Sequence, residues 1–160
     1  MVTELAWKKI HYVWKSYLWP DRSSPIEPNS AMCYLDGYDM INMSSTPTFF
    51  GYVIDDVIVG VNSGHACPNQ NNYRSRGLWV DPDHRGRGIG QQLLIATIEQ
   101  GRKEGYAQIW SYPRQTSWPT YSAVGFELTS DWASSETSEA NAYCLYSLPS
   151  RLLYFLSGSK

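Results

Sequence analysis

The residues best suited to chemistry lie in the segment 84–90, which reads HRGRGIG. Glycine occupies every second position from 86 to 90, and an arginine precedes each of the first two glycines. Glycines let the chain turn tightly and let a bulky ligand approach the backbone. If a helix begins here, its first N–H groups lack intrahelical partners and bind anions, and the arginines add charge-assisted donors. The segment therefore predicts a phosphate-binding loop.

Three other readings of this segment fit less well. A dinucleotide fingerprint needs G-x-G-x-x-G, but its third glycine would fall at position 91, which is Gln91. A P-loop needs G-K-[ST] at its end, and the segment has none. His84, Arg85 and Arg87 would make a basic patch, but no Lys/Arg run extends it and the net charge is −2. The charge pattern argues against nucleic acid as a partner.

The residues on either side predict a strand, a loop and a helix. Arg76–Val80 favours a strand with a bulge at Gly77, and Asp81-Pro82 ends it. Ile89–Glu104 has apolar residues on both faces, which is typical of a buried helix, and Gly105 caps its end. The phosphate-binding loop is therefore expected at a helix N-terminus.

The rest of the chain predicts a mixed α/β (α+β) fold, in which a mostly antiparallel sheet of about six to seven strands is flanked by helices. Two strands around Asp55-Asp56 form a hairpin, the polar segment 66–73 is a loop, and 31–45 holds a short helix or a turn at Gly37. The other expected strands are Val2–Leu5, Phe49–Ile54, Val57–Val61, Ala107–Tyr112, Phe126–Asp131 and Asn141–Leu148, and the other helices are Lys8–Leu18 and Ser117–Val124.

We expect a single domain over residues 1–148 and a C-terminal tail over 149–160. The tail carries a run of apolar residues that suits a docking helix or an interface, so a homodimer is one expectation.

Two stretches of this domain resemble the GNAT acetyltransferases, which move an acetyl group from acetyl-CoA to an amine. LWVDPDHRGRGIGQQLLIATIEQGRKEGY is similar to the family's central motif, including the pattern R-x-x-G-x-G from Arg85. YSAVGF is similar to the family's Tyr-x-x-x-Gly-Phe, with Tyr121, Gly125 and Phe126 in the matching positions. The two motifs lie within residues 78–126 at the family's usual spacing. The order of the predicted elements also fits.

The resemblance implies acetyl-CoA as co-substrate. Backbone amides from about Arg87 to Gln91 would hold its pyrophosphate. The strand ending at Val80 would splay away from the strand at Ile109, so that the pantetheine arm lies in the gap and the acetyl carbonyl lies near Val80. The implied cofactor-binding residues are Leu78, Trp79, Val80, Arg85, Gly86, Arg87, Gly88, Ile89, Gly90 and Gln91.

For the catalytic groups, Tyr121 matches the family's usual general acid, because a phenol can donate to the departing sulfur. A tyrosine that only packs under the cofactor is the alternative. Many family members carry a glutamate as base early on the strand before the loop, but here that region reads NNYRSRG. His65 is the local substitute, since its proton affinity suits neutral pH. A structural histidine, with deprotonation through ordered water, stays open.

The acceptor is expected to be a primary amine on a small molecule or a protein. Glu27, Asp36 and Asp39 would attract a cationic amine, or are solvated loop carboxylates. Arg114 stands near a position where the family often has asparagine, which leaves substrate contacts at that corner unassigned. The predicted function is an N-acetyltransferase, and the alternative is a catalytically silent acyl-CoA-binding or interaction module.

Composition sets the remaining expectations. The three cysteines are widely spaced and odd in number, which favours free thiols in a reducing compartment. His65 and Cys67 lack a second ligand pair at metal-site spacing, so no metal is expected. No apolar run approaches the roughly 20 residues that a membrane helix needs. We expect a cytoplasmic protein without a membrane partner.

Overall fold

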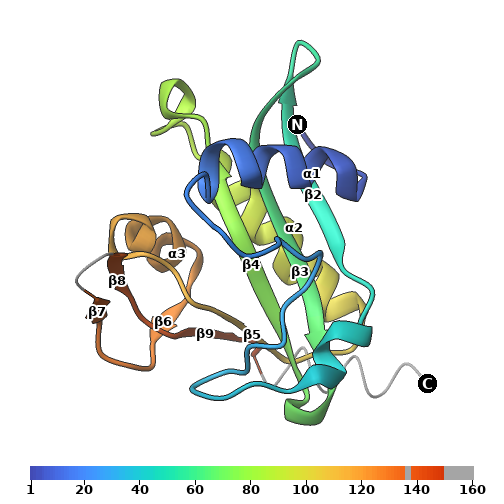
Figure 1. Cartoon of the computed structure of the whole chain (residues 1–160), viewed down its shortest axis with the longest axis vertical. Coiled ribbons are helices and arrows are strands. Elements are labelled where there is room, and N and C mark those ends of the chain that lie inside the picture. The colour runs from blue at the N-terminus through green and yellow to red at the C-terminus, as the bar shows by residue number, and fades with distance from the viewer. Residues whose placement is uncertain (136–137, 150–160) are drawn as a thin grey trace.

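The main sheet has one parallel pair of neighbours, β4 and β5, among antiparallel pairs (Figure 1). The computed structural model describes residues 1–135 and 138–149, so most of the predicted tail lies outside the described residues. Within them the seven-stranded sheet has the order β1-β2-β3-β4-β5-β9-β6, and β7 and β8 form a separate pair. The predicted mixed, mostly antiparallel α+β fold is confirmed. The strands are β1 (Val2–Glu4), β2 (Thr48–Ile54), β3 (Val57–Cys67), β4 (Asn72–Val80), β5 (Gln108–Ser111), β6 (Glu127–Leu128), β7 (Ala133–Ser135), β8 (Ser138–Asn141) and β9 (Cys144–Ser147).

Helices cover both faces of this sheet (Figure 1). On the face in front in that view, α1 and the π-helical segment η1 cross the strands, and Trp14 packs against Trp79. On the opposite face α2 runs behind the strands, and Leu94 packs in one cluster with Tyr73. The helices are α1 (Trp7–Val13), η1 (Trp14–Leu18), α2 (Ile89–Lys103) and α3 (Trp118–Val124), with 3₁₀ turns η2 (Met40–Ser44), η3 (Pro68–Gln70), η4 (Pro82–His84) and η5 (Gln115–Ser117).

The central hairpin is longer than the sequence predicted. β3 continues to Cys67 and β4 already begins at Asn72, so the expectation of a loop over 66–73 was wrong except for the turn η3. Several of the added strand residues are polar, and some of their polar atoms find partners inside the fold. Nδ2 of Asn62 donates to Ser75 Oγ and to Thr97 Oγ1, each over 2.8 Å. Buried polar groups that find such partners can occupy a strand, although their sequence is typical of a loop.

Most other elements lie where they were expected. α1 and η1 together cover the predicted first helix, and α2 and α3 begin and end within a residue or two of their predicted bounds. In the last third of the chain, the strand expected over Phe126–Asp131 spans only Glu127–Leu128, because the chain then turns toward β7. The β7–β8 pair lies in the polar segment that was expected to be a loop.

The parallel pair β4–β5 is short, and this opens the sheet. Its register joins Tyr73 with Ile109 and Arg74 with Trp110. β5 ends at Ser111, whereas β4 continues to Val80. The second half of β4 therefore runs on without β5 beside it, which is the splay expected from the sequence.

An irregularity at Gly77 redirects β4 just beyond this pair. Gly77 has a φ of +82°, a conformation that favours glycine, and the β3–β4 register shifts between Val61 and Ser63. A Cβ at Gly77 would overlap the ring of Trp14. Nε1 of Trp14 donates to the Gly77 carbonyl over 2.9 Å. The predicted bulge is confirmed, and η1 packs directly on it.

Candidate functional site

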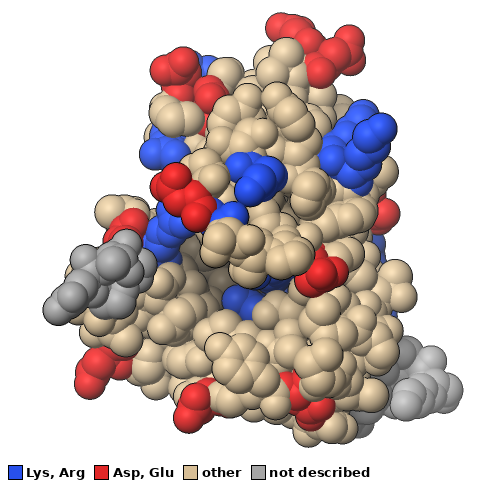
Figure 2. Space-filling view, in the orientation of Figure 1, with Lys and Arg blue, Asp and Glu red and all other residues tan. Residues whose placement is uncertain are grey.

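A cleft of about 630 Å³ lies where β4 and β5 separate. Its walls come from η1, from β4, from the loop with the first turn of α2, and from the segment between β5 and α3. Figure 2 shows the molecule hollowed in the middle of this face, with Lys or Arg atoms at the bottom of the hollow. Every predicted cofactor-binding residue except Arg87 lines this cleft.

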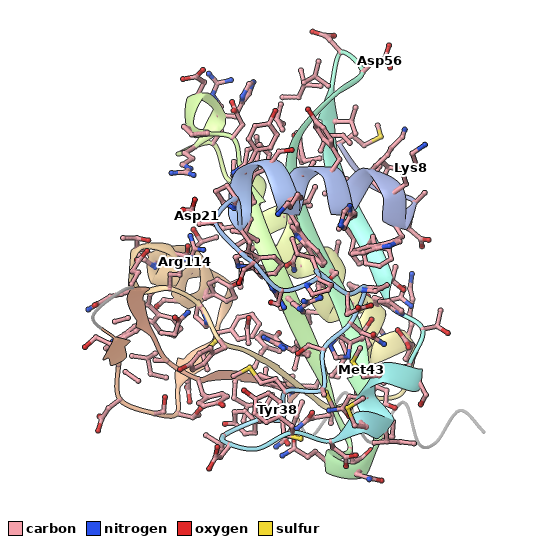
Figure 3. All side chains as sticks on the ribbon, in the orientation of Figure 1. Lys8, Asp21, Tyr38, Met43, Asp56 and Arg114 are labelled. Carbon is pink, nitrogen blue, oxygen red and sulfur yellow. The ribbon has the colours of Figure 1, made fainter. Side chains whose placement is uncertain are left out.

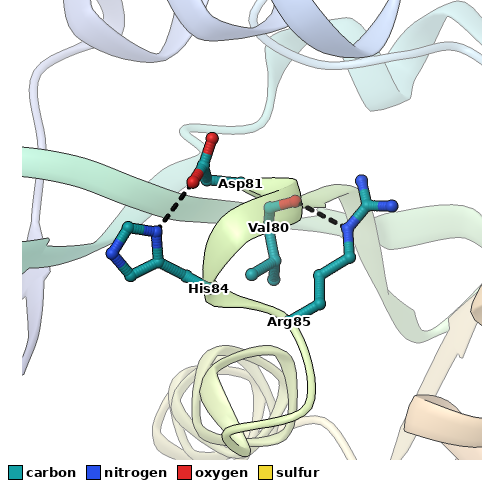
Figure 4. A network of polar contacts seen from close by, with 4 residues as sticks. All are labelled: Val80, Asp81, His84 and Arg85. Carbon is teal, nitrogen blue, oxygen red and sulfur yellow. Dashed lines mark hydrogen bonds and ion pairs between the residues drawn. The ribbon is translucent and has the colours of Figure 1, made fainter.

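The segment 84–90, called the glycine loop below, is fastened to the end of β4 by two polar contacts (Figure 4). Nε of Arg85 donates to the Val80 carbonyl over 3.0 Å. Nδ1 of His84 lies 2.7 Å from a carboxylate oxygen of Asp81. These side chains are used on the protein itself, so the loop's shape is fixed without a ligand.

The backbone of the glycine loop has a geometry that suits an anion. Gly86 and Gly88 have φ values of +76° and +77°, and Gly88 immediately precedes α2. The hydrogen bond from Gln92 N to Gly88 O, 3.1 Å long, closes the first turn of that helix. The N–H groups of residues 89–91 precede it and have no acceptor within the helix. The first turn also has no acidic side chain, so a phosphate group fits this position.

Tyr121 projects from α3 to the floor of the cleft. Its side chain is 3% exposed, and its ring packs edge-on against Phe126 with centroids 5.3 Å apart. Its hydroxyl lies 3.5 Å from Ser111 Oγ, which itself donates to the Ser75 carbonyl over 2.8 Å. Burial raises the pKa of Tyr121 well above its usual value, so the phenol stays protonated and can donate. Ser111 was not predicted, because a lone serine at a strand end has no distinguishing pattern.

His65 lies in β3 and is not among the residues that line the cleft. Its side chain is 0% exposed, and its Nδ1 lies 3.2 Å from the Ala66 carbonyl. Burial, and then the positive charge of Arg74, lower the pKa of His65 to about 3. It is therefore neutral at physiological pH and has a weak affinity for protons. This placement argues against the expected role as general base.

The three carboxylates predicted for the acceptor side lie outside the cleft lining as well. The Asp36 carboxylate accepts from the Gly37 N–H over 2.7 Å in an exposed turn. The Asp39 carboxylate accepts from Asn69 Nδ2 at 2.8 Å and from the Ile41 N–H at 3.1 Å, and these bonds hold its pKa below the usual range. Glu27 is exposed, and only its backbone carbonyl reaches toward the cleft. These positions fit the alternative that the three residues are solvated loop carboxylates.

Two arginines that were not predicted as site residues lie at the inner end of the cleft. Arg74 and Arg76 alternate along β4 and are both buried. The Arg74 guanidinium lies 4.8 Å from the Trp110 ring, and that of Arg76 lies 4.9 Å and 5.2 Å from the rings of Trp14 and Trp19. Burial lowers their pKa values to about 10 and about 9, so both remain charged at neutral pH. If the predicted strand had begun at Asn72, the i, i+2 spacing in NNYRSRG would have placed both arginines on the same face of β4.

The side wall of the cleft is closed by Arg114 (Figure 3). Its Nη2 donates to the Leu18 carbonyl over 3.1 Å and so joins the loop after β5 to the end of η1. Glu139, from β8, also lines the cleft, and its carboxylate accepts from the Thr116 N–H over 2.8 Å. Glu139 was missed because the β8 segment was expected to be a loop.

Residues 1–135 and 138–149 lack two features, a metal-binding cluster and a membrane-spanning helix. No group of three or more His, Cys, Asp and Glu side chains is arranged to hold a metal ion there. No helix in these ranges has the length and apolar character needed to cross a membrane.

Solved structures share this fold at low sequence identity. An acetyltransferase of the GNAT family from Staphylococcus aureus matches with a TM-score of 0.64 and 16% identity over 93% of this chain and 99% of its own. yncA from Salmonella typhimurium, solved with its cofactor acetyl-CoA, matches with a TM-score of 0.64 and 14% identity over 93% and 94%. The PaiA N-acetyltransferase from Thermoplasma acidophilum, in complex with coenzyme A, matches with a TM-score of 0.52 and 17% identity over 63% and 60%.

The sequence gives a more specific result than these folds. The comparison with curated proteins found no match. A family model described as the acetyltransferase (GNAT) family matches residues 7–126. That range includes η1, both strands of the splay, the glycine loop and Tyr121. The chain belongs to the GNAT acetyltransferase family.

Proposed function

We propose that this protein transfers an acetyl group from acetyl-CoA to a primary amine that binds in the same cleft. One observation carries the proposal: a single cleft contains an anion-binding backbone loop at one end and a buried, protonated tyrosine on its floor. Family membership supports the reaction type, and the solved relatives bound to acetyl-CoA or coenzyme A support the co-substrate.

The residues present suit acetyl-CoA. The backbone N–H groups at the start of α2 would hold its pyrophosphate, and the free edge of Leu78–Val80 would hydrogen-bond its pantetheine arm. This co-substrate supplies an acetyl thioester. The splay between β4 and β5 leaves the space that such an extended arm requires.

Tyr121 is proposed to donate a hydrogen bond to the sulfur as the new amide forms and the C–S bond breaks. Its raised pKa keeps the donor proton in place at neutral pH. Ser111 Oγ lies within reach of both the Ser75 carbonyl and the Tyr121 hydroxyl and can donate its single proton to either; donated to the phenol oxygen, it leaves the phenol proton free for the sulfur. Tyr121 is thus the proposed catalytic residue, and Ser111 a positioning residue.

The acceptor amine must lose a proton before it attacks. Glu139 is the one carboxylate among the described residues that line the cleft, and its hydrogen bonds with Thr116 keep its pKa below the usual range. A carboxylate so stabilised is a poor base. We therefore propose that the proton leaves through water, without a dedicated side-chain base.

The proposal is tested in two steps. Isothermal titration calorimetry with acetyl-CoA should show stoichiometric binding, and a thiol-release assay across a panel of primary amines should then show turnover. Absence of acetyl-CoA binding at high micromolar concentration would overturn the proposal. Binding without turnover across the whole panel would instead support the acyl-CoA-binding module.

A further inference from the structure

The inner end of the cleft holds a buried cation whose hydrogen-bonding capacity is not met within the described residues. Arg74 is 9% exposed and lines the cleft. Its Nε and Nη1 are buried without a hydrogen-bond partner among the residues described. A buried charge normally has a counter-ion or a full set of hydrogen bonds, because removing it from water is costly. The Trp110 ring meets the face of the guanidinium and leaves its in-plane N–H donors unused.

Arg76 makes a useful contrast two residues further along β4. Its Nη1 donates to the Glu27 carbonyl over 2.8 Å, and two tryptophan rings enclose its guanidinium. It has local partners, yet it brings a second positive charge to the same face of the strand. After burial, the positive charge of Arg74 lowers the pKa of Arg76 further. Together, Arg74 and Arg76, called the arginine pair below, form a strongly positive floor.

Among the described residues, no carboxylate offsets this charge at Arg74. The groups that interact electrostatically with Arg74 are a thiol and tyrosine hydroxyls, from Cys67, Tyr143, Tyr121 and Tyr38. The Glu27 side chain near Arg76 is exposed to solvent. The one cleft-lining carboxylate of the described residues, Glu139, is engaged with Thr116. A buried positive floor of this kind suits an anionic ligand group.

The arginine pair is adjacent to the proposed reaction centre. Ser75 lies between the two arginines in β4, and its carbonyl accepts from Ser111 Oγ. Ser111 Oγ in turn lies 3.5 Å from the Tyr121 hydroxyl. A small molecule that reaches Tyr121 with its amine is therefore close enough to place a second group on the arginine pair.

We propose that the amine acceptor is a small molecule that also carries a carboxylate, and that Arg74, supported by Arg76, binds this carboxylate. The inference rests on the proposed function and names its substrate class, an amino acid or a related amino carboxylate. A planar carboxylate matches the in-plane donors of a guanidinium in a bidentate pair. The same positive floor repels a diamine or polyamine, and it disfavours the ammonium form of the acceptor.

The test measures binding separately from turnover. The protein saturated with coenzyme A is titrated calorimetrically with free amino acids, with their C-terminal amides and with alkyl diamines. At least one free amino acid should bind about tenfold or more tightly than its amide, because the amide lacks the charge. Equal affinity of amino acids and amides, or tighter binding of diamines, would overturn the carboxylate assignment. Failure of acetyl-CoA to bind would instead count against the proposed function, so the two failures differ.

Substitutions locate the site. Arg74→Gln should weaken amino-acid binding by about tenfold or more, abolish the preference over the amide and leave acetyl-CoA affinity unchanged. Arg74→Lys keeps the positive charge but loses the bidentate guanidinium, so its amino-acid affinity should lie between those of the wild type and Arg74→Gln. It replaces Arg74→Gln in the test if that variant does not fold. The matched control is Arg102→Gln, which replaces a partly exposed arginine of α2 paired with Glu99 outside the cleft and should change none of these affinities. Full amino-acid preference in Arg74→Gln would overturn the assignment.

Discussion

The two ends of the cleft present positive charge in different ways. The glycine loop presents backbone N–H groups at the start of α2, and Arg85 Nε and His84 Nδ1 hold it to the end of β4. The arginine pair presents side chains, and its position depends on aromatic rings from η1, from Trp19 that follows it, and from β5. The glycine loop is built from one contiguous segment, whereas the arginine pair depends on segments that are far apart in the chain.

This difference separates the two partners of the proposed reaction. Backbone groups at a helix N-terminus can bind a phosphate without a specific side chain, so that end would suit the co-substrate shared by a family. Side chains on a strand can change without altering the backbone, so the other end can specify an acceptor. Tyr121 lies between the ends, and the largest predicted effect falls on it.

Tyr121→Phe removes only the hydroxyl between the two ends. We expect the turnover number to fall about ten- to a thousand-fold, the usual range for a lost proton donor. Calorimetric affinities for acetyl-CoA and for the acceptor should stay within a factor of about two, because neither end of the cleft is altered. Steady-state kinetics and calorimetry on the same preparation measure both.

The control removes the same atom from a tyrosine in the same core cluster. Tyr146 is partly buried and packs on Phe126, as Tyr121 does, but it does not line the cleft. Tyr146→Phe should keep full turnover. If both variants were equally active, the alternative of a tyrosine that only packs would be correct.

The same difference between local and assembled features explains how much could be predicted. The glycine loop, α2 and the β2–β3 hairpin were predictable, because each depends on contiguous residues whose spacing matches one structure. The ends of β3 and β4 were not. Some of their polar residues find partners only in the folded protein, as Asn62 does with Ser75 and Thr97, and no local pattern shows such pairing.

The site follows the same rule. Every predicted cofactor residue but Arg87 lines the cleft, since all belong to one segment. The arginine pair was missed because its meaning depends on Trp14, Trp19 and Trp110, which lie far away in the chain. His65 was chosen by residue type alone, and its burial could not be read from the sequence.

The next test concerns the burial of His65 beside the arginine pair. It lies opposite Arg74 across the β3–β4 ladder, and its pKa of about 3 is below the 6.5 of a free histidine. Between these values the unfolded chain binds a proton that the folded protein does not, so stability falls as the pH falls. Through this group, the free energy of unfolding should fall by about 2 kcal/mol between pH 7 and pH 5.

Denaturant unfolding of the wild type and of His65→Leu at both pH values isolates this contribution. Other groups titrate in both proteins and cancel, so the difference in unfolding free energy should move by about 2 kcal/mol in favour of the variant at pH 5. An unchanged difference would show that His65 is not buried as a neutral group. A large loss of turnover in a folded His65→Gln variant would restore the role of general base.

The smallest expected effect tests the glycine end, with a matched pair of glycines at the two ends of α2. Gly88 and Gly105 have φ values of +77° and +94°, and a Cβ at either would meet no atom within 4 Å. Alanine at each position should cost about 1–2 kcal/mol of stability, because both adopt the left-handed conformation. Only Gly88 faces the cleft.

Gly88→Ala should therefore weaken acetyl-CoA binding about five- to tenfold, or about 1 kcal/mol, while Gly105→Ala leaves it unchanged. Since the Cβ at Gly88 touches nothing in the protein, a selective loss of affinity must come from the space and the backbone shape that the pyrophosphate needs. Equal affinities in the two variants would place the anion elsewhere in the cleft. The glycine loop would then not be the end of the cleft that binds through its backbone, although the sequence predicted this role most directly for that segment.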